Sequence, residues 1–357
     1  MANRNKGEWS EIYAFFKLLS DGRMYSADGH LNLINDKYAP ILEIFRNDDP
    51  GRIAYKVHSA KNTILAVGEQ FHLEIPQETF KKEADRLLEI IKTSDMRDEN
   101  FKEVYAFMEK IKCGSVSAKS TDKADIRIVI HRLADGTTPE LGYSIKSKLG
   151  GSSTLINSNK DASNFVFRID GINDEQMRYI NGFGKFKKKF DYLKSIGATW
   201  EFVKVAQSAL RNNLNMLDIG MARVIAACLE KYYTGEANEI SDICRKITGD
   251  DPLHIMHDTD QPMYEYKIKQ FLLAFALGMT VSSEWDGSFN ANGGYIVIRE
   301  DGDLACYHFF DRNEFEEYLF YNTAFDTPST TRHKFGDIYK EDCCYYMKLN
   351  IQVRFKN

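Results

Sequence analysis

The chain has 357 residues, a formal net charge of −5 and an isoelectric point of about 6.0. Aromatic residues make up 13% of it, and only 7 prolines occur, so we expect a folded protein of two or three packed subdomains rather than a disordered chain. The acidic balance gives no support for nucleic-acid binding, although affinity for phosphate depends on local basic patches. Its six cysteines form no CxxC pair, and no signal region or apolar run of about 18 residues occurs. We therefore expect a reduced, cytoplasmic compartment and no membrane partner.

The first part of the chain predicts helices around short strands. Residues 5–19 place Trp9, Ile12 and Phe16 at helical spacing, which indicates an amphipathic helix. Residues 24–28 are expected to lead into a loop, and residues 53–75 contain three short runs typical of strands. Apolar residues at helical spacing follow Pro76 and continue to residue 111.

Residues 124–151 predict a hairpin with an aspartate at the start of its first strand and lysines at the end of its second. Isoleucines alternate with other residues from Ile126 to Ile130, and Asp135-Gly136 marks a turn before a second strand. If these strands pair, Asp125 lies near Ser144 and Lys146 at one edge of a sheet. A carboxylate beside a lysine on neighbouring strands is a site that can hold a divalent metal and activate water against phosphate.

The segment after this hairpin is rich in small polar residues. It contains paired glycines followed by hydroxyl and amide side chains, among them Ser152, Ser153, Thr154, Asn157 and Asn164. These residue types dominate flexible loops, but beside glycine they also approach phosphates and base edges closely. We predict DNA contact for them. Residues 165–169 then predict another strand.

Residues 173–248 are mostly helical in pattern, with helices expected around residues 203–210 and 221–232. Five lysines between residues 185 and 194 form either a solvated helix face or a track for a phosphate backbone. A loop at residues 252–262 carries His254, His257, Asp258 and Asp260, a weak zinc pattern because no cysteine pair accompanies it. Residues 263–277 predict a buried helix.

The C-terminal part is predicted to be β-rich. Residues 294–300 and 304–310 flank Asp301-Gly302-Asp303, a hairpin signal, and a short helix is expected at residues 313–322. Residues 326–336 form a polar basic loop, and residues 345–355 alternate polar with apolar side chains in one final strand. Arg, Asn and Gln are side chains that read base edges. We expect DNA contacts from the loop and this strand, whose candidates are Arg332, His333, Lys334, Lys348, Asn350, Gln352 and Arg354; a solvated strand face explains the alternation equally well.

Four segments together resemble one protein family. NKGEWSEIYAFFKLL at residue 5, GYSIKSKLGGSSTLIN at 142, DTPSTTRHKFGDIYKED at 326 and MKLNIQVRF at 347 are similar to the HpaII family of type II restriction endonucleases, in matching order over essentially the whole chain. The resemblance implies an α/β fold with a PD-(D/E)xK core, which is a mixed central sheet flanked by helices, with additional helical and β-rich C-terminal subdomains. It also implies a bacterial enzyme that uses Mg²⁺, cuts duplex DNA at CCGG and works beside a DNA methyltransferase.

Carried onto this sequence, the resemblance implies that Asp125 is the catalytic aspartate and Lys146 the catalytic lysine. Ser144 stands where the usual motif has Glu or Asp, and Ala124 replaces the usual proline. Because a neutral hydroxyl adds no charge, a second carboxylate is needed from elsewhere. The backbone carbonyl of Ile145 is expected as a further metal ligand, and Lys148 as a phosphate contact.

Three residues are candidates for the second carboxylate. Glu11 on the N-terminal helix is the first choice and Glu8 the second, although acids at a helix start also favour the helix dipole by themselves. Asp161 is a poorer substitute from the segment after the lysine strand.

The resulting hypothesis is a type II restriction endonuclease that acts as a homodimer on palindromic DNA. Its predicted organisation is an N-terminal region at residues 1–113 that contributes a helix to the active site, a catalytic core at 114–250 and a DNA-recognition region at 251–357. The alternatives are a DNA-binding protein that has lost cleavage, which Ser144 keeps open, and a repair or structure-specific nuclease of the same superfamily.

Overall fold

The computed structural model describes residues 5–48, 51–93, 96–116, 124–256 and 259–356. These residues form two compact units. Among the described residues, unit 1 comprises those up to 153 together with 289–318, and unit 2 comprises 154–288 and 319–356. The chain therefore enters unit 2, returns to unit 1 and then completes unit 2, a division that differs from the three consecutive ranges predicted from the sequence.

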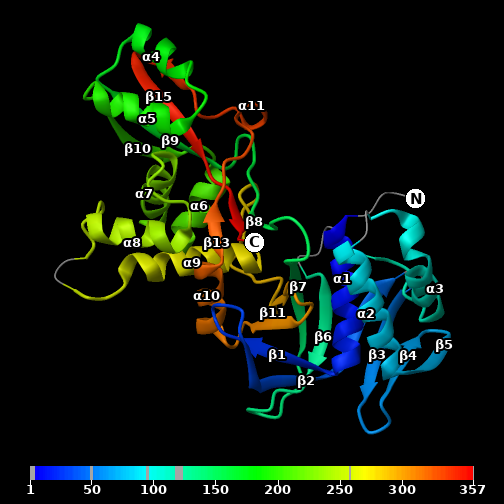
Figure 1. The fold of residues 1–357 in the computed structure, drawn as a ribbon. Coiled ribbons are helices and arrows are strands. Elements are labelled where there is room, and N and C mark those ends of the chain that lie inside the picture. The colour runs from blue at the N-terminus through cyan, green and yellow to red at the C-terminus, as the bar shows by residue number, and fades with distance from the viewer. Residues whose placement is uncertain (1–4, 49–50, 94–95, 117–123, 257–258, 357) are drawn as a thin grey trace. The chain divides into compact units, whose positions relative to one another are not determined.

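Unit 1 is built on a mixed nine-stranded sheet with the strand order β1-β12-β11-β7-β6-β2-β3-β4-β5 (Figure 1). Its strands are β1 (Arg23–Ala27), β2 (Leu33–Asp48), β3 (Gly51–His58), β4 (Thr63–Gly68), β5 (Phe71–Pro76), β6 (Ile126–Ile130), β7 (Glu140–Ser147), β11 (Gly294–Ile298) and β12 (Leu304–His308). The pairs β1·β12 and β7·β11 are parallel, and the other pairings are antiparallel. This sheet and the helices of the unit confirm a mixed α/β architecture around a central sheet.

Helices pack on this sheet through a large apolar core. They are α1 (Lys6–Asp21), α2 (Gln77–Thr93), the short 3₁₀ helix η1 (Asp98–Phe101) and α3 (Lys102–Lys110), and α10 (Arg312–Tyr321) runs from unit 1 into unit 2. Trp9 of α1 is fully buried and stacks on Phe101 with ring centroids 4.0 Å apart. Burial of such aromatic surface is the main force that holds α1 in place.

Local sequence explains where α1 begins and ends. The Asn5 side chain accepts a hydrogen bond from the Glu8 N–H, and the Glu8 carboxylate accepts one from the Asn5 N–H, which is a complete capping box. At the other end Gly22 takes a left-handed conformation, with φ +61°, that is strained for residues with a side chain. The helix predicted for residues 5–19 is confirmed.

Unit 2 combines helices with two small sheets. Its helices are α4 (Asp174–Asn181), α5 (Phe186–Ser195), α6 (Ser208–Leu217), α7 (Met221–Tyr233), α8 (Ile240–Asp250), α9 (Met263–Leu277) and α11 (Thr330–His333). Its strands are β8 (Thr154–Ile156), β9 (Asn164–Asp170), β10 (Thr199–Val205), β13 (Thr323–Phe325), β14 (Ile338–Glu341), β15 (Cys344–Asn350) and β16 (Val353–Phe355). They form the sheets β10-β9-β15-β14 and β13-β16-β8.

Three local predictions are wrong. Residues 24–28, expected to lead into a loop, contain most of β1, which pairs with both β2 and β12. The helix expected at 203–210 is instead the end of β10 followed by the start of α6. The final strand is broken at Ile351, whose N–H donates to the Ser163 carbonyl, so that β15 and β16 lie in different sheets.

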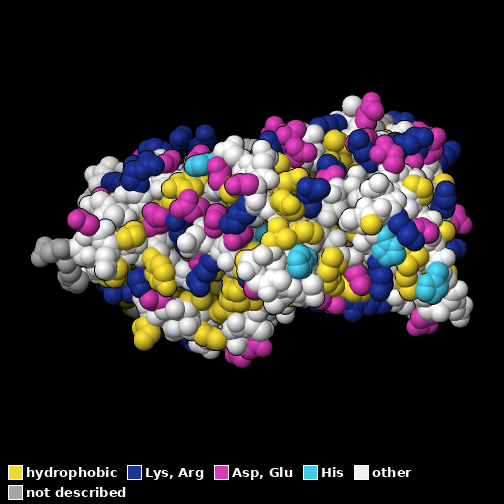
Figure 2. Space-filling view, turned by 90° about the horizontal axis from the view of Figure 1, so that it is seen from below, with side chains coloured by type: hydrophobic (Ala, Val, Ile, Leu, Met, Phe, Trp, Pro, Cys, Tyr) yellow, Lys and Arg dark blue, Asp and Glu magenta, His cyan; other side chains and the backbone are white. Residues whose placement is uncertain are grey.

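The surface is chemically mixed. Figure 2 shows lysine and arginine side chains interspersed with aspartate and glutamate on the face that it displays. In the part of the chain that the structure describes, no helix is long and apolar enough to cross a membrane.

Candidate active site

The predicted hairpin is present and places its charged residues together. β6 and β7 pair antiparallel with Ile126 opposite Tyr143. Asp125 immediately precedes β6, and its N–H donates to the Tyr143 carbonyl at 2.8 Å. This pairing brings Asp125 beside Ser144, two residues before Lys146 on β7.

The Asp125 carboxylate is held by β7 through one of its two oxygens. Its Oδ2 accepts hydrogen bonds from the Ser144 hydroxyl at 3.0 Å and from the Ile145 N–H at 2.6 Å. Hydrogen bonds to a charged acceptor are stronger than neutral ones, so they fix the direction of the carboxylate. Oδ1 receives no hydrogen bond from any residue that the structure describes. In this arrangement Ser144 orients Asp125 and leaves Oδ1 available for a ligand.

Helix α1 carries Glu11 to the same site. The Ser10 hydroxyl lies 2.8 Å from the Ser147 hydroxyl and thereby joins α1 to the end of β7. Glu11 is half-buried. It lines, with Asp125 and Lys146, a cavity of about 430 Å³ that lies within unit 1. Two carboxylates from segments more than a hundred residues apart therefore line one open cavity.

The other two candidates for the second carboxylate are not among the residues that line this cavity. Glu8 is part of the capping box with Asn5, which gives its carboxylate a structural partner, and it is not among the residues that line the cavity. Asp161 belongs to unit 2 and lines a separate hollow there. The geometry favours Glu11.

The ammonium group of Lys146 is in an unusual environment. The side chain is half-buried, and its Nζ lies 5.2 Å from the centroid of the Tyr295 ring. Burial lowers the pKa of Lys146 below its ordinary value of 10.5, while the negative charges of Asp125 and Glu11 act in the opposite direction. Lys146 is therefore closer to losing its proton than a surface lysine is.

Tyr295 is a residue of this site that sequence reasoning missed. It lies on β11, which pairs in parallel with β7 and sets Tyr295 opposite Ser144. Burial raises the pKa of Tyr295 well above 10, and the charges of Tyr318 and Asp125 act in the same direction. The run GYIVI signals a buried strand, but nothing in it indicates that its partner lies 150 residues earlier.

Glycines and hydroxyls complete the cavity wall. Gly150, Gly151 and Ser153 line it together with Lys6, so Ser153 is the predicted DNA-contacting hydroxyl that the structure places in the cavity. Lys148 and Ser152 are half-buried residues of the same unit, whereas Thr154 and Asn157 belong to unit 2.

Several of the predicted DNA contacts are buried instead of exposed. Asn164 and Asn350 are each 1% exposed, and the Asn350 amide donates to the Asn164 side-chain oxygen at 2.8 Å. Gln352 is 6% exposed, and Arg354 forms an ion pair with Asp326 at 2.7 Å. Asn350 and Asn164 bond to each other within the sheet of β9 and β15, and Gln352 is buried, which argues against a base-reading role for these amides.

The basic loop before β14 keeps its exposed side chains. Arg332 and Lys334 are exposed, Lys348 is half-buried, and the His333 Nε2 lies 3.2 Å from the Ser158 hydroxyl. These four residues remain positioned for contact with a ligand of unit 2.

No larger metal-binding cluster accompanies the pair of carboxylates. In residues 5–48, 51–93, 96–116, 124–256 and 259–356, no three His, Cys, Asp or Glu side chains are placed to hold one ion. Of the weak zinc pattern, His257 and Asp258 lie outside the described residues. The donors that the cavity offers are Asp125, Glu11 and backbone oxygens, a set suited to a hard cation.

Comparison with known proteins identifies the family. The family model for the HpaII restriction endonuclease matches residues 5–355. The type II restriction enzyme HpaII of Haemophilus parainfluenzae is 40% identical over 352 residues, which are 98% of this chain and 98% of the relative. No solved structure matches. The chain therefore belongs to the HpaII restriction endonuclease family and is a type II restriction endonuclease.

Proposed function

We propose that this enzyme cuts both strands of duplex DNA at CCGG, with a PD-(D/E)xK-type site built from Asp125, Glu11 and Lys146. The observation that carries the proposal is that these three side chains line one cavity of unit 1. A short acidic patch beside a lysine of lowered pKa is the chemistry that phosphodiester hydrolysis requires. The choice of CCGG follows the resemblance to the family.

The residues fit Mg²⁺ as the cofactor. Mg²⁺ usually binds through one or two carboxylates, with water and substrate phosphate as its other ligands. Asp125 offers Oδ1, Glu11 offers a second carboxylate from α1, and the Ile145 carbonyl is the proposed backbone ligand. When bound, the metal lowers the pKa of a water molecule and offsets charge on the phosphate.

The protein side chains then have separate tasks. Ser144 and the Ile145 N–H hold Asp125 in one direction. Lys146 orients the attacking water or, in its neutral amine form, accepts a proton from it, and as an ammonium it balances negative charge on the scissile phosphate. Lys148, Ser152 and Ser153 contact the DNA backbone near the cavity. The products carry 5′-phosphate and 3′-hydroxyl ends.

The enzyme is expected to work as a homodimer beside a methyltransferase. A palindromic target presents the same half-site twice, which suits two copies of the chain related by a two-fold axis. DNA of the host needs protection at the same sequence, so a cognate methyltransferase is the functional partner. The bacterial cytoplasm stays the predicted location.

Mapping every cut in DNA of known sequence tests this proposal. The purified protein with Mg²⁺ is expected to produce discrete fragments whose ends all lie within CCGG. The same DNA methylated within CCGG is the matched control and is expected to stay intact. Fragment ends in another sequence would overturn the assigned target. Binding without cleavage would show a DNA-binding protein, and nicks that ignore sequence would show a structure-specific nuclease.

A further inference from the structure

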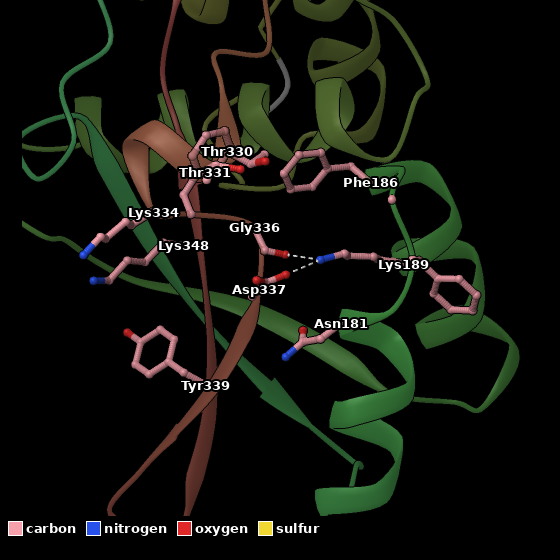
Figure 3. A pocket seen from close by; sticks show the side chains of 13 residues that line it. Asn181, Phe186, Lys189, Thr330, Thr331, Lys334, Gly336, Asp337, Tyr339 and Lys348 are labelled. Atoms are coloured by element: carbon pink, nitrogen blue, oxygen red, sulfur yellow. Dashed lines mark hydrogen bonds and ion pairs between the residues drawn. The ribbon is translucent and has the colours of Figure 1, made fainter.

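Unit 2 contains a hollow of about 570 Å³ that the cleavage chemistry does not use. Figure 3 shows its lining side chains, which come from the α4–α5 region, from the segment around α11 and from β14 and β15. Aromatic side chains, among them Phe186 and Tyr339, form part of the wall, and the Thr330 and Thr331 residues line it beside lysines. The hollow is thus both polar and large enough for a substantial group.

The charge of this hollow is positive in an acidic chain. Its charged lining residues are Lys189, Lys334, Lys348 and Asp337, three lysines against one aspartate, which gives +2 where the whole chain carries −5. The one carboxylate is already paired, because the buried Lys189 ammonium lies 2.8 Å from the Asp337 Oδ1 and donates to the Gly336 carbonyl at 2.7 Å. The positive charges of Lys334 and Lys348 are therefore not neutralised from within the hollow.

Lys334 and Lys348 have no acidic partner among the residues that the structure describes. The Lys348 Nζ lies 5.5 Å from the centroid of the Tyr339 ring, a contact that leaves the ammonium its charge. Figure 3 shows the two side chains extending in the same direction. Two like charges that line one hollow repel each other, and an anion between them would remove that repulsion.

The wall that carries these lysines is fixed before any ligand binds. The Asn181 side chain donates to the Ile338 carbonyl at 2.8 Å and accepts from the Ile338 N–H at 2.7 Å. The Gly336 N–H donates to the Lys348 carbonyl at 2.9 Å, which joins the loop to β15. Gly336 has φ +90°, and a Cβ there would lie 2.5 Å from the Phe186 ring. A site held in this way loses little conformational entropy on binding.

A neighbouring hollow of unit 2 has the opposite character. Asp161, Glu341 and Asp342 line it, with Lys204 and Lys348 as its basic residues, so three acids face two lysines and the balance is −1. Lys348 belongs to both walls. A phosphate is therefore repelled from the acidic hollow beside Asp161 and attracted to the basic hollow beside Lys334.

We propose that the hollow between Lys334 and Lys348 binds a phosphate of the DNA backbone and so anchors unit 2 on the substrate. The inference rests on the proposed function for its ligand, since DNA is the phosphate-bearing molecule that this enzyme holds. Phosphate contacts fix the position of a protein on the duplex without reading sequence. The anchor is accordingly expected to serve cognate and non-cognate DNA alike.

The test measures how salt weakens binding. Wild type and Lys334→Gln/Lys348→Gln bind a labelled duplex with one CCGG site, without divalent metal, over a series of KCl concentrations. Loss of one neutralised phosphate lowers the slope of log K against log[salt] by about 1. The double variant, which removes both lysines from the one phosphate site, is expected to lower the slope by about 1 and to bind tenfold or more weakly at the lowest salt. Lys204→Gln/Lys246→Gln, which removes two exposed lysines of unit 2, is the matched control with an unchanged slope.

Further variants and measurements distinguish failure of the phosphate site from failure of the proposed function. Lys334→Arg/Lys348→Arg keeps both charges and is expected to restore the slope, and the thermal unfolding midpoint of each variant shows that it is folded. If wild type cuts DNA but the Gln variant keeps the full slope, the phosphate site is refuted and the proposed function stands. If wild type neither binds nor cuts DNA, the proposed function fails and this inference with it. Titration with inorganic phosphate gives the last outcome: binding that the Gln variant loses, with the duplex slope unchanged, would assign the hollow to a free phosphate and overturn the DNA anchor.

Discussion

Lys146→Met is expected to lower the single-turnover rate of cleavage of a CCGG duplex about 10³-fold or more while the duplex is still bound. The Lys146 ammonium shares its cavity with Asp125 and Glu11, so it lies where water and the scissile phosphate must meet. General acid–base catalysis contributes about 10²–10⁴-fold, and stabilisation of phosphate charge adds to this. Cleavage and binding are measured separately, by fragment formation with Mg²⁺ and by fluorescence anisotropy without it. A variant that cleaves at the wild-type rate would show that Lys146 is not catalytic.

Thermal unfolding of Lys146→Met shows whether the variant is folded. Burial holds the pKa of Lys146 in the folded protein below its unfolded value of 10.5. Between these two pH values the unfolded chain binds the extra proton, so the stability of wild type rises with pH through this window. At pH values below the pKa of Lys146 in the folded protein, the buried ammonium lowers the stability of the fold by its full desolvation penalty. Methionine at this position carries no charge and has no such penalty. Lys146→Met is therefore expected to unfold at a higher temperature than wild type at neutral pH, and this advantage is expected to shrink as the pH approaches 10.5.

Glu11→Gln is expected to lower the cleavage rate about 10²-fold and to raise the Mg²⁺ concentration needed for half-maximal rate. The substitution keeps the shape of the side chain but removes one of the two carboxylates that line the cavity, and Mg²⁺ depends on such charged oxygens. The rate as a function of Mg²⁺ concentration separates weaker metal binding from slower chemistry.

Glu8→Gln is the matched control, because it makes the same chemical change three residues earlier on the same helix. Glutamine still completes a capping box, so the expected loss is only the interaction with the helix dipole, about 0.3–1 kcal/mol of stability. Equal loss of activity in both variants would mean that the two glutamates act through α1 as a whole. Full activity in both would exclude both glutamates and leave Asp161 as the candidate to be tested by the same substitution.

Local patterns in the sequence were sufficient to predict the strands and the helix that carry Asp125, Ser144 and Glu11. Alternating isoleucines and a turn at Asp135-Gly136 correctly predicted that β6 and β7 pair, and this pairing alone sets Asp125 beside Ser144. Helical spacing predicted α1, whose Glu11 then follows one turn after the capping residues. Each of these features is encoded within about 25 residues of chain, where periodicity is informative.

Contacts between distant segments could not be predicted in the same way. The parallel strand β11 joins β7 from 150 residues away and brings Tyr295 to Lys146, and it also carries part of the C-terminal region into unit 1. A buried strand has no side-chain pattern that names its neighbour. The prediction of one DNA-contacting strand at residues 345–355 was wrong for a related reason. Alternation of polar residues looks the same whether the polar face meets solvent or, as for Asn350, a buried partner.

Single-turnover cleavage of one CCGG duplex by wild type and by Asp125→Asn tests the catalytic site most directly. Asparagine retains an oxygen that can accept from the Ser144 hydroxyl and the Ile145 N–H, but it loses the charge that the cofactor requires. With equal amounts of DNA bound, wild type is expected to cut both strands and the variant to cut neither. Cleavage by Asp125→Asn at a rate close to that of wild type would contradict the assignment of this cavity as the active site.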